Sequence, residues 1–120
     1  MQGILVIAHG SRSNETEKNI ETITDILKNK FSGMPVVAAY AEFGEATIEK
    51  GIERLIECEV DEILAVPYFL FDGYHVKKGI PEEISRVLEK YPSVKLKFGR
   101  VLGSDKRIAD ILADRIEELI

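Results

Sequence analysis

The chain contains two histidines, and both follow an apolar run of the kind that forms a buried strand. His9 comes directly after GILVIA (residues 3–8), and His75 lies in FLFDGYHVKKGIP, beyond the run EILAV (residues 62–66). In open α/β sheets, ligands bind beyond the carboxyl ends of the strands, where the strand order reverses. Neutral imidazole suits cobalt, nickel, zinc and iron, and a site with few protein ligands keeps coordination positions open. The pattern therefore predicts a reactive metal site at which His9 and His75 meet.

A carboxylate is expected at the same edge. Glu42 follows the apolar run VVAAY, within AYAEFGEATI, and could complete a ligand set or accept protons. Taken alone, Glu42 could also be a helix cap or a surface carboxylate, and either histidine could be an ordinary polar loop residue. Glu45 lies close by and fits better as support for the N-terminus of the next helix. The coincidence of three such residues at one predicted crevice favours a site.

Positive charge and hydrogen-bond donors flank the two histidines. Ser11 and Arg12 follow His9 at the start of a helix, whose N-terminus favours anions, and two lysines follow His75. The candidate substrate-binding residues are Ser11, Arg12, Tyr74, Lys77 and Lys78. The alternative is that they are first-turn residues and a solvated lysine pair. As a site, they indicate an anionic substrate.

Four strand–helix pairs would position these side chains. Strands are expected at residues 3–8, 36–40, 62–66 and 94–98. Helices are expected directly after Asn14, which would cap the first one in a capping box with Glu17, from Glu45 or Ala46, from Pro81, and after Asp105. This alternation predicts an α/β fold, with a parallel sheet covered by helices on both faces. Right-handed crossovers restrict the topology, and we expect a flavodoxin-like order of 2-1-3-4 in one domain over residues 1–120.

Two further segments carry expectations of their own. The last helix has an apolar stripe that consists of Ile108, Ile111, Leu112, Ile116 and Leu119. The single cysteine, Cys58, cannot form an internal disulfide, and its helix-like setting predicts a small buried side chain.

Composition limits the function classes. The chain has 120 residues, of which 45% are hydrophobic and 31% charged, a balance that excludes disorder and fits a soluble globular domain. Its net charge of −5 argues against nucleic acid or an anionic membrane as a partner of the whole surface. Neither a signal segment nor an apolar run of membrane-spanning length is found, so we expect a cytoplasmic protein.

The same residues resemble a known family. AHGSR, AEFGEATI, VPYFLFDGYHVKKGIP and RVLGSDKRIADILADRI together resemble the small class II tetrapyrrole chelatases, in particular the single-domain sirohydrochlorin chelatases that insert cobalt or nickel. HGSR alone is a weak signal, whereas HGSR combined with PxFLxxGxH is fairly specific. The resemblance covers nearly the whole chain.

The resemblance implies ATP-independent insertion of Co²⁺, or of Ni²⁺, into the anionic macrocycle sirohydrochlorin, as in cobalamin-type tetrapyrrole biosynthesis. It implies a homodimer, and no cofactor beyond the substrate metal. The family histidines map onto His9 and His75 as metal ligands, and the family acid maps onto Glu42. Either Glu42 or one of the histidines would be the base. The sequence departs from the family pattern at Gly79, where an aspartate is usual, and at Ala46, where a proline is usual.

Three other functions compete. A non-catalytic metal or tetrapyrrole carrier would use the same ligands. A histidine phosphatase also places His-Gly after its first strand, but its histidine follows an arginine, and here that residue is Ala8. A flavodoxin-like FMN binder is the third, and the single glycine of HGSRSN argues only weakly against it.

Overall fold

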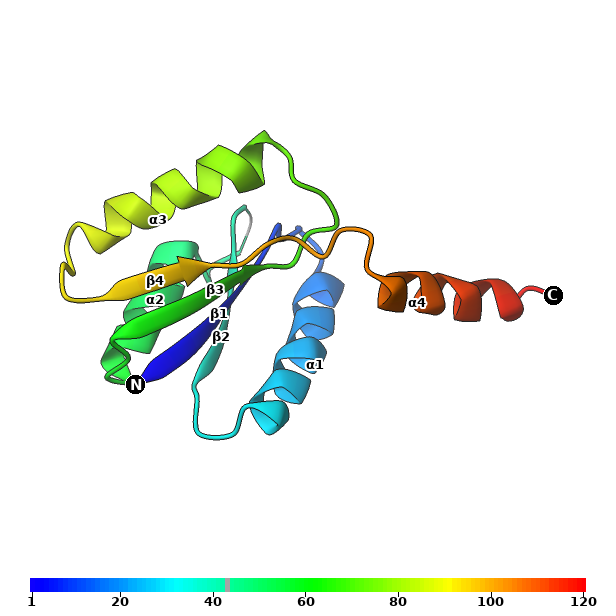
Figure 1. The fold of residues 1–120 in the computed structure, drawn as a ribbon, viewed down its shortest axis with the longest axis horizontal. Helices are drawn as coiled ribbons and strands as arrows, with labels where there is room; N and C mark the ends of the chain where they lie inside the picture. The colour runs from blue at the N-terminus through cyan, green and yellow to red at the C-terminus, as the bar shows by residue number, and fades with distance from the viewer. Residues whose placement is uncertain (43) are drawn as a thin grey trace.

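The computed structural model describes residues 1–42 and 44–120, and its elements alternate between strand and helix (Figure 1). They are β1 (Gln2–Ala8), α1 (Asn14–Lys30), β2 (Val36–Tyr40), α2 (Ile48–Glu57), β3 (Glu62–Pro67), the π-helical turn η1 (His75–Gly79), α3 (Ile80–Leu88), β4 (Lys95–Phe98) and α4 (Lys106–Glu117). None of the described helices combines the length and the apolar character needed to cross a bilayer.

The strands form one parallel sheet in the order β2-β1-β3-β4, which confirms the predicted topology. β1 lies in the centre, with Ile4 beside Val36 of β2 on one side and Leu64 of β3 on the other. A strand buried on both faces needs apolar residues at every position, and β1 is buried from Gly3 to Ala8. The switch in strand order therefore lies at the carboxyl ends of β1 and β3.

The two faces of the sheet are covered unequally. On one face, α2 and α3 pack over the sheet and form the main core. The largest side chains buried there are Leu5, Ile7, Ile48, Ile52, Leu55, Ile63 and Ile80. On the other face, α1 covers β1 and β2, where Ile4, Val6 and Val36 are buried. This second cover does not extend to Val66 of β3, which is 39% exposed.

Three helices begin at residues other than those predicted. Ser13, not Asn14, caps α1, because its Oγ accepts a hydrogen bond from the Glu15 N–H. Thr47 caps α2 by accepting from the Lys50 N–H, so this helix begins at Ile48. The third helical segment begins before Pro81, because η1 runs directly into α3.

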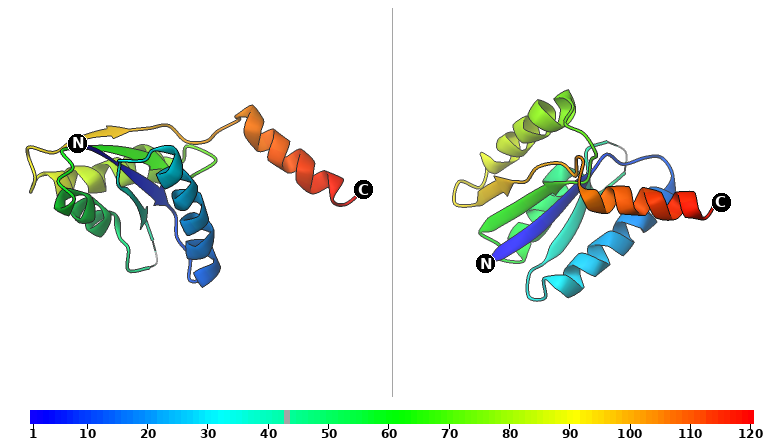
Figure 2. Two further views of the ribbon diagram at one scale, coloured as in Figure 1. Left: turned by 90° about the horizontal axis from the view of Figure 1, so that it is seen from below. Right: turned by 45° about the vertical axis from the view of Figure 1, so that its right-hand side comes forward.

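The prediction for Cys58 is wrong: the residue is exposed at the carboxyl end of α2. The backbone turns sharply after it, with Glu59 at a φ of 65°, and carries Val60 into the core in its place. At the other end of the chain, α4 projects from the body (Figures 1 and 2). The Cα radius of gyration is 15.2 Å, against about 13.6 Å for a compact chain of this length.

Candidate metal site at the strand exits

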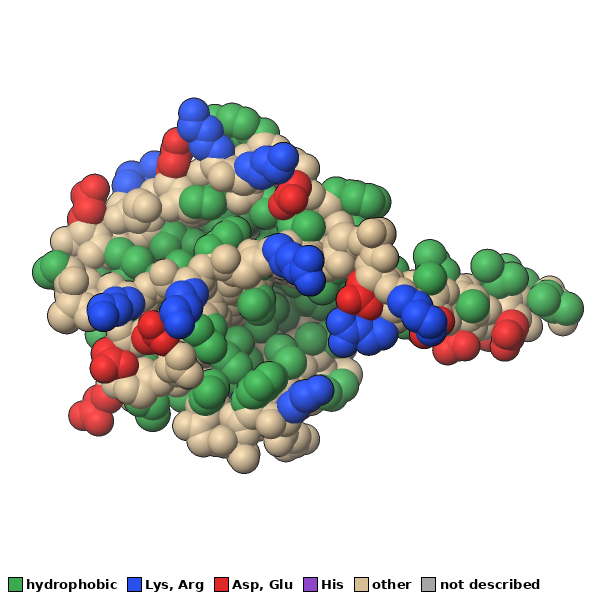
Figure 3. All heavy atoms as spheres, viewed as in Figure 1, with side chains coloured by type: hydrophobic (Ala, Val, Ile, Leu, Met, Phe, Trp, Pro, Cys, Tyr) green, Lys and Arg blue, Asp and Glu red, His purple; other side chains and the backbone are tan. Residues whose placement is uncertain are grey.

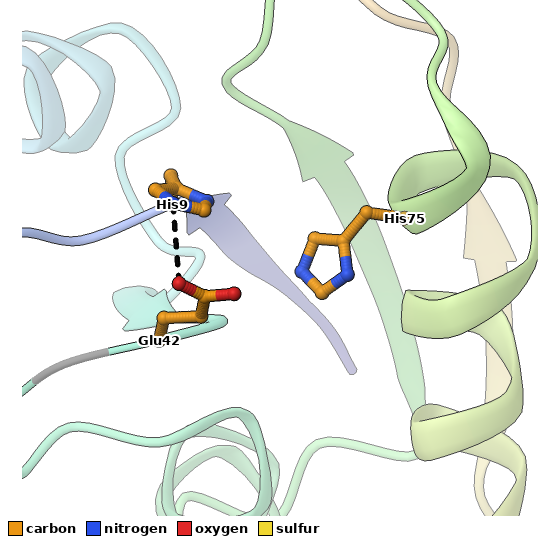
Figure 4. A group of neighbouring side chains, drawn as sticks. All are labelled: His9, Glu42 and His75. Carbon is orange, nitrogen blue, oxygen red and sulfur yellow. Dashed lines mark ion pairs between the residues drawn. The ribbon is translucent and has the colours of Figure 1, made fainter.

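Three side chains from separate elements converge beyond the carboxyl ends of the strands. His9, Glu42 and His75 each offer one ligand atom, and these atoms lie within 4.8 Å of one another (Figure 4). The predicted meeting of the two histidines and the carboxylate is thus found in the structure. Imidazole nitrogens and a carboxylate oxygen at this separation can bind a divalent first-row transition metal.

The ends of β1 and β2 bring His9 and Glu42 together. The Ala41 N–H donates to the Ala8 carbonyl and the Glu42 N–H to the His9 carbonyl, both at 2.9 Å, so the strand pairing continues past the sheet. Gly10 then turns the chain with a φ of 90°, a conformation that glycine adopts without strain. As a result, His9 Nε2 lies 3.3 Å from Glu42 Oε2, and the two side chains are 54% and 48% exposed.

A helical turn, rather than a strand end, presents His75. The Tyr68 N–H donates to the Ile7 carbonyl at 2.7 Å, which ties the exit of β3 to β1, and the chain then runs to η1. In this turn the Ile80 N–H reaches back to the His75 carbonyl. Val76 and Ile80 are buried and anchor the turn to the core. Such π turns occur often at functional sites.

The Nε2 atom of His75 is buried and makes no hydrogen bond with any described residue. Figure 4 shows the His75 imidazole directed toward His9 and Glu42. The His9 and His75 ring centroids are 6.1 Å apart, with the rings at 79°. Because buried polar atoms are nearly always satisfied, an unpaired nitrogen aimed at two other ligand atoms is a specific sign of a cation site.

Two residues next to the histidines had no role in the predicted ligand set. The Phe69 ring contacts His9 edge-on, with centroids 6.3 Å apart. A Cβ added at Gly79 would lie 3.2 Å from His75 Nδ1, so glycine leaves room for the imidazole. Gly79 lies four residues after His75, a helical spacing that could have indicated the contact. No signal in the sequence pointed to the contact of Phe69.

The predicted substrate-binding residues follow the end of β1 or lie at η1, and they differ in exposure. The Ser11 hydroxyl accepts from the Ser13 N–H at 2.9 Å and shares a hydrogen bond of 2.8 Å with Thr16, so it shapes the turn into α1. Arg12 is exposed in that turn, and Lys77 and Lys78 are exposed on η1. Tyr74 is 74% exposed directly before His75.

An exposed apolar segment borders the site. Between β3 and η1, the exposed fractions are 40% for Tyr68, 48% for Leu70, 78% for Phe71 and 74% for Tyr74. Apolar patches rimmed by charge mark binding surfaces more often than chance exposure does. The cluster of His9, Glu42 and His75 is therefore open to solvent and has an apolar edge. We call this surface the shelf.

A groove of about 480 Å³ lies elsewhere, along β2 between α1 and α2. Its lining includes Glu17, Glu21 and Tyr40 but none of the three clustered ligands. Burial, and then the charges of Glu17 and Glu21, raise the pKa of Tyr40. Because the groove lacks the convergent ligand atoms of the shelf, we place the candidate chemistry at the strand exits.

Known proteins resemble this chain over nearly all of its length. The family model described as CbiX matches residues 3–119. A sirohydrochlorin ferrochelatase of Priestia megaterium is 36% identical over 98% of this chain, but the match covers 44% of that protein. The sirohydrochlorin cobaltochelatase of Sulfurisphaera tokodaii is 32% identical over 100% of this chain and 95% of its own length. That of Methanosarcina acetivorans is 34% identical, with coverages of 98% and 96%.

Solved structures agree with the fold. The sirohydrochlorin chelatase SirB from Bacillus subtilis subspecies spizizenii, solved in complex with cobalt, superimposes with a TM-score of 0.91 at 30% identity, over 98% of this chain and 50% of that one. The chain thus spans about half the length of SirB and of the first curated relatives, at 44% and 45%. A CbiX protein from Marinobacter aquaeolei shares the fold, with a TM-score of 0.81 at 23% identity.

Proposed function

We propose that this chain, which belongs to the CbiX family, inserts a divalent metal into sirohydrochlorin. The observation that carries the proposal is the convergence of His9, Glu42 and His75, with the buried Nε2 of His75 unpaired and aimed at the other two. Co²⁺ is the proposed metal, because the relatives that match over 95–96% of their own length are named cobaltochelatases. Ni²⁺ is second, since imidazole suits both ions.

The reaction exchanges two protons for one metal ion. The free macrocycle loses two pyrrole N–H protons as the metal enters, and the divalent ion replaces their charge. We assign the ligand role to His9 and His75 and the proton-accepting role to Glu42. Glu42 supports this assignment because it is 48% exposed, so each proton that it accepts can pass to water, and because it directly contacts His9.

The borders of the shelf fit an anionic, flat substrate. The apolar segment from Tyr68 to Tyr74 would contact a face of the macrocycle, with the exposed ring of Tyr74 nearest to His75 in the sequence. Arg12, Lys77 and Lys78 would bind its carboxylates, and arginine can do so with two parallel hydrogen bonds. Ser11 stays a weaker candidate, because its hydroxyl already bonds within the turn.

Four further expectations belong to this proposal. We propose that residues 1–120 act as a single domain, that they need no nucleotide, and that the protein is cytoplasmic. We also propose a homodimer, because the shelf is open and half-exposed and would gain a second wall from another copy.

The test is absorbance during incubation of the protein with Co²⁺, Ni²⁺ or Fe²⁺ and a large excess of sirohydrochlorin, without ATP. We expect many turnovers per protein, fastest with Co²⁺. A carrier would instead stop at one equivalent of bound metal or macrocycle. If no metal enters faster than in the protein-free mixture, the chelatase proposal is wrong.

A further inference from the structure

Few contacts hold the His9 imidazole in place. Its side chain is 54% exposed, and Gly10 turns the chain directly after it. Glu42 contacts the ring, but this carboxylate is itself 48% exposed and accepts protons in the proposed reaction. An imidazole that can rotate into water loses that freedom when it binds a metal, and the loss weakens binding unless another group already holds the ring.

An aromatic ring lies against the imidazole. The ring centroids of Phe69 and His9 are 6.3 Å apart, with the ring planes at 81°. This edge-to-face arrangement is one of those that aromatic pairs prefer. Neither histidine is visible on the face of the molecule shown in Figure 3, so other atoms of the protein cover both imidazoles from that side. Phe69 is therefore a candidate for the group that holds His9.

Phe69 is itself held more firmly than its neighbours in the chain. Its side chain packs against the main core, whereas those of Tyr68 and Phe71 are exposed. Its backbone is fixed on both sides of the residue. The Tyr68 N–H donates to the Ile7 carbonyl at 2.7 Å, and the Phe69 carbonyl accepts from the Leu102 N–H at 2.9 Å. The ring is thus a fixed surface beside a ligand that has few other supports.

We propose that Phe69 is a positioning residue, which holds the His9 imidazole toward His75 and Glu42 before the metal arrives. The inference rests on the proposed function and adds to it a residue that is not a metal ligand. A phenyl ring suits this role because it has neither a lone pair that competes for the metal nor a polar hydrogen.

The lack of a polar group also fits a metal that must leave again. A hydrogen bond to the second nitrogen of a ligating imidazole raises its basicity and tightens metal binding. A chelatase has to release its metal to the macrocycle in every turnover. Packing against Phe69 orients His9 without that added basicity, so the same contact favours loading and does not oppose release.

The first test is a double-mutant cycle on Co²⁺ binding alone, measured by titration without macrocycle. Phe69→Leu removes the ring but keeps an apolar side chain at the core. We expect its dissociation constant for Co²⁺ to be about tenfold larger than that of the parent, as for other outer-shell partners of a metal ligand. In a His9→Ala background, the same substitution should change the constant by less than about twofold, because the ring that it positions is absent. Equal changes in both backgrounds would overturn the inference.

Leu88→Ala is the matched control for a loss of packing. Leu88 is also a partly buried side chain on the main core, but it is the last residue of α3. Urea unfolding should show that both Phe69→Leu and Leu88→Ala are less stable than the parent. Only Phe69→Leu should change the Co²⁺ affinity and the visible absorption of bound Co²⁺, which reports the arrangement of its ligands. If Leu88→Ala changed both as much, Phe69 would act only through stability.

Cobalt insertion into sirohydrochlorin by the same proteins separates this inference from the proposed function. If Phe69 and His9 are coupled in Co²⁺ binding but the parent inserts no metal, the proposed function alone is wrong. If the parent inserts cobalt and Phe69→Leu binds Co²⁺ as tightly as the parent does, the positioning role alone is wrong.

Discussion

The two halves of the metal site are built in opposite ways. His9 stands at a strand end, half-exposed, with Glu42 Oε2 3.3 Å from its Nε2. His75 is presented by a π-helical turn, and its Nε2 is buried without a hydrogen-bond partner among the described residues. One half keeps a carboxylate in contact with both water and an imidazole. The other half keeps a nitrogen away from water, with its lone pair or proton unpaired.

This difference indicates a division of labour. An unsatisfied buried polar atom costs about 1–3 kcal/mol, and that cost persists only where folding of the rest of the chain outweighs it. A metal bound by His75 Nε2 would remove this cost. The half of the site formed by η1 and His75, which we call the helical half, therefore favours metal binding before the macrocycle arrives. The strand-end half, with Glu42, is suited to carrying protons away. Each half can be tested separately.

The largest effect should come from removing either imidazole. We expect His9→Ala and His75→Ala each to lower the rate of cobalt insertion by more than about 100-fold, because loss of a ligand exceeds the 10- to 100-fold effect typical of an outer-shell partner. Absorbance of the metallated product gives the rate, and circular dichroism checks folding. If either variant kept a third of the parent rate, the two halves would not be joint parts of one site.

Glu42→Gln should have the next largest effect. The amide keeps the size of the side chain but cannot accept a proton, so we expect the insertion rate to fall about 10- to 100-fold. Cobalt affinity, measured by titration, should change much less than the rate. Glu45→Gln is the matched control, since Glu45 lies nearby but outside the cluster, and it should behave like the parent. A larger loss of affinity than of rate would make Glu42 a ligand rather than the base.

Stability should separate the two histidines where activity does not. His75→Leu removes the unpaired buried nitrogen, so we expect it to raise the free energy of unfolding by about 1 kcal/mol. His9→Leu, at a half-exposed position, should stay within about 0.5 kcal/mol of the parent. Urea unfolding in the presence of a chelator, at one protein concentration, gives both values. If His75→Leu were less stable than the parent, the buried nitrogen would not carry a cost in folding free energy.

The strand-end half was predictable from the sequence, because the rules that place it are simple. An apolar run marks a buried strand, parallel strands end at one edge, and the switch point follows from the topology. These rules place His9 and Glu42 at one edge, and the structure brings them together. The order of the strands was predictable for the same reason.

The helical half could be located but not described. The π turn depends on a hydrogen bond from the Ile80 N–H to the His75 carbonyl, for which the sequence has no signature. The burial of His75 Nε2 depends on tertiary packing, which the local sequence pattern does not specify. The stripe of α4 was predictable as a pattern, but periodicity does not show which surface a helix covers. Cys58 was mispredicted because its helix ends at that residue.

The smallest effect on the insertion rate should come from substitution of Gly79. An added methyl group there tests how closely the backbone at position 79 packs against the His75 imidazole. In Gly79→Ala, the new Cβ would lie 3.2 Å from His75 Nδ1, so the ring must shift by a few tenths of an ångström. We expect about a threefold loss of insertion rate, since misplacement by a full ångström can cost about 100-fold. Gly73→Ala is the matched control, because a Cβ there meets nothing within 4 Å.

Alanine at 79 should also stabilise the helical segment, by about 0.5–1 kcal/mol. If Gly79→Ala lowers the insertion rate and raises stability, while Gly73→Ala leaves the insertion rate unchanged, then glycine at position 79 serves to position His75. Equal rates for the two variants would show that the imidazole tolerates the shift.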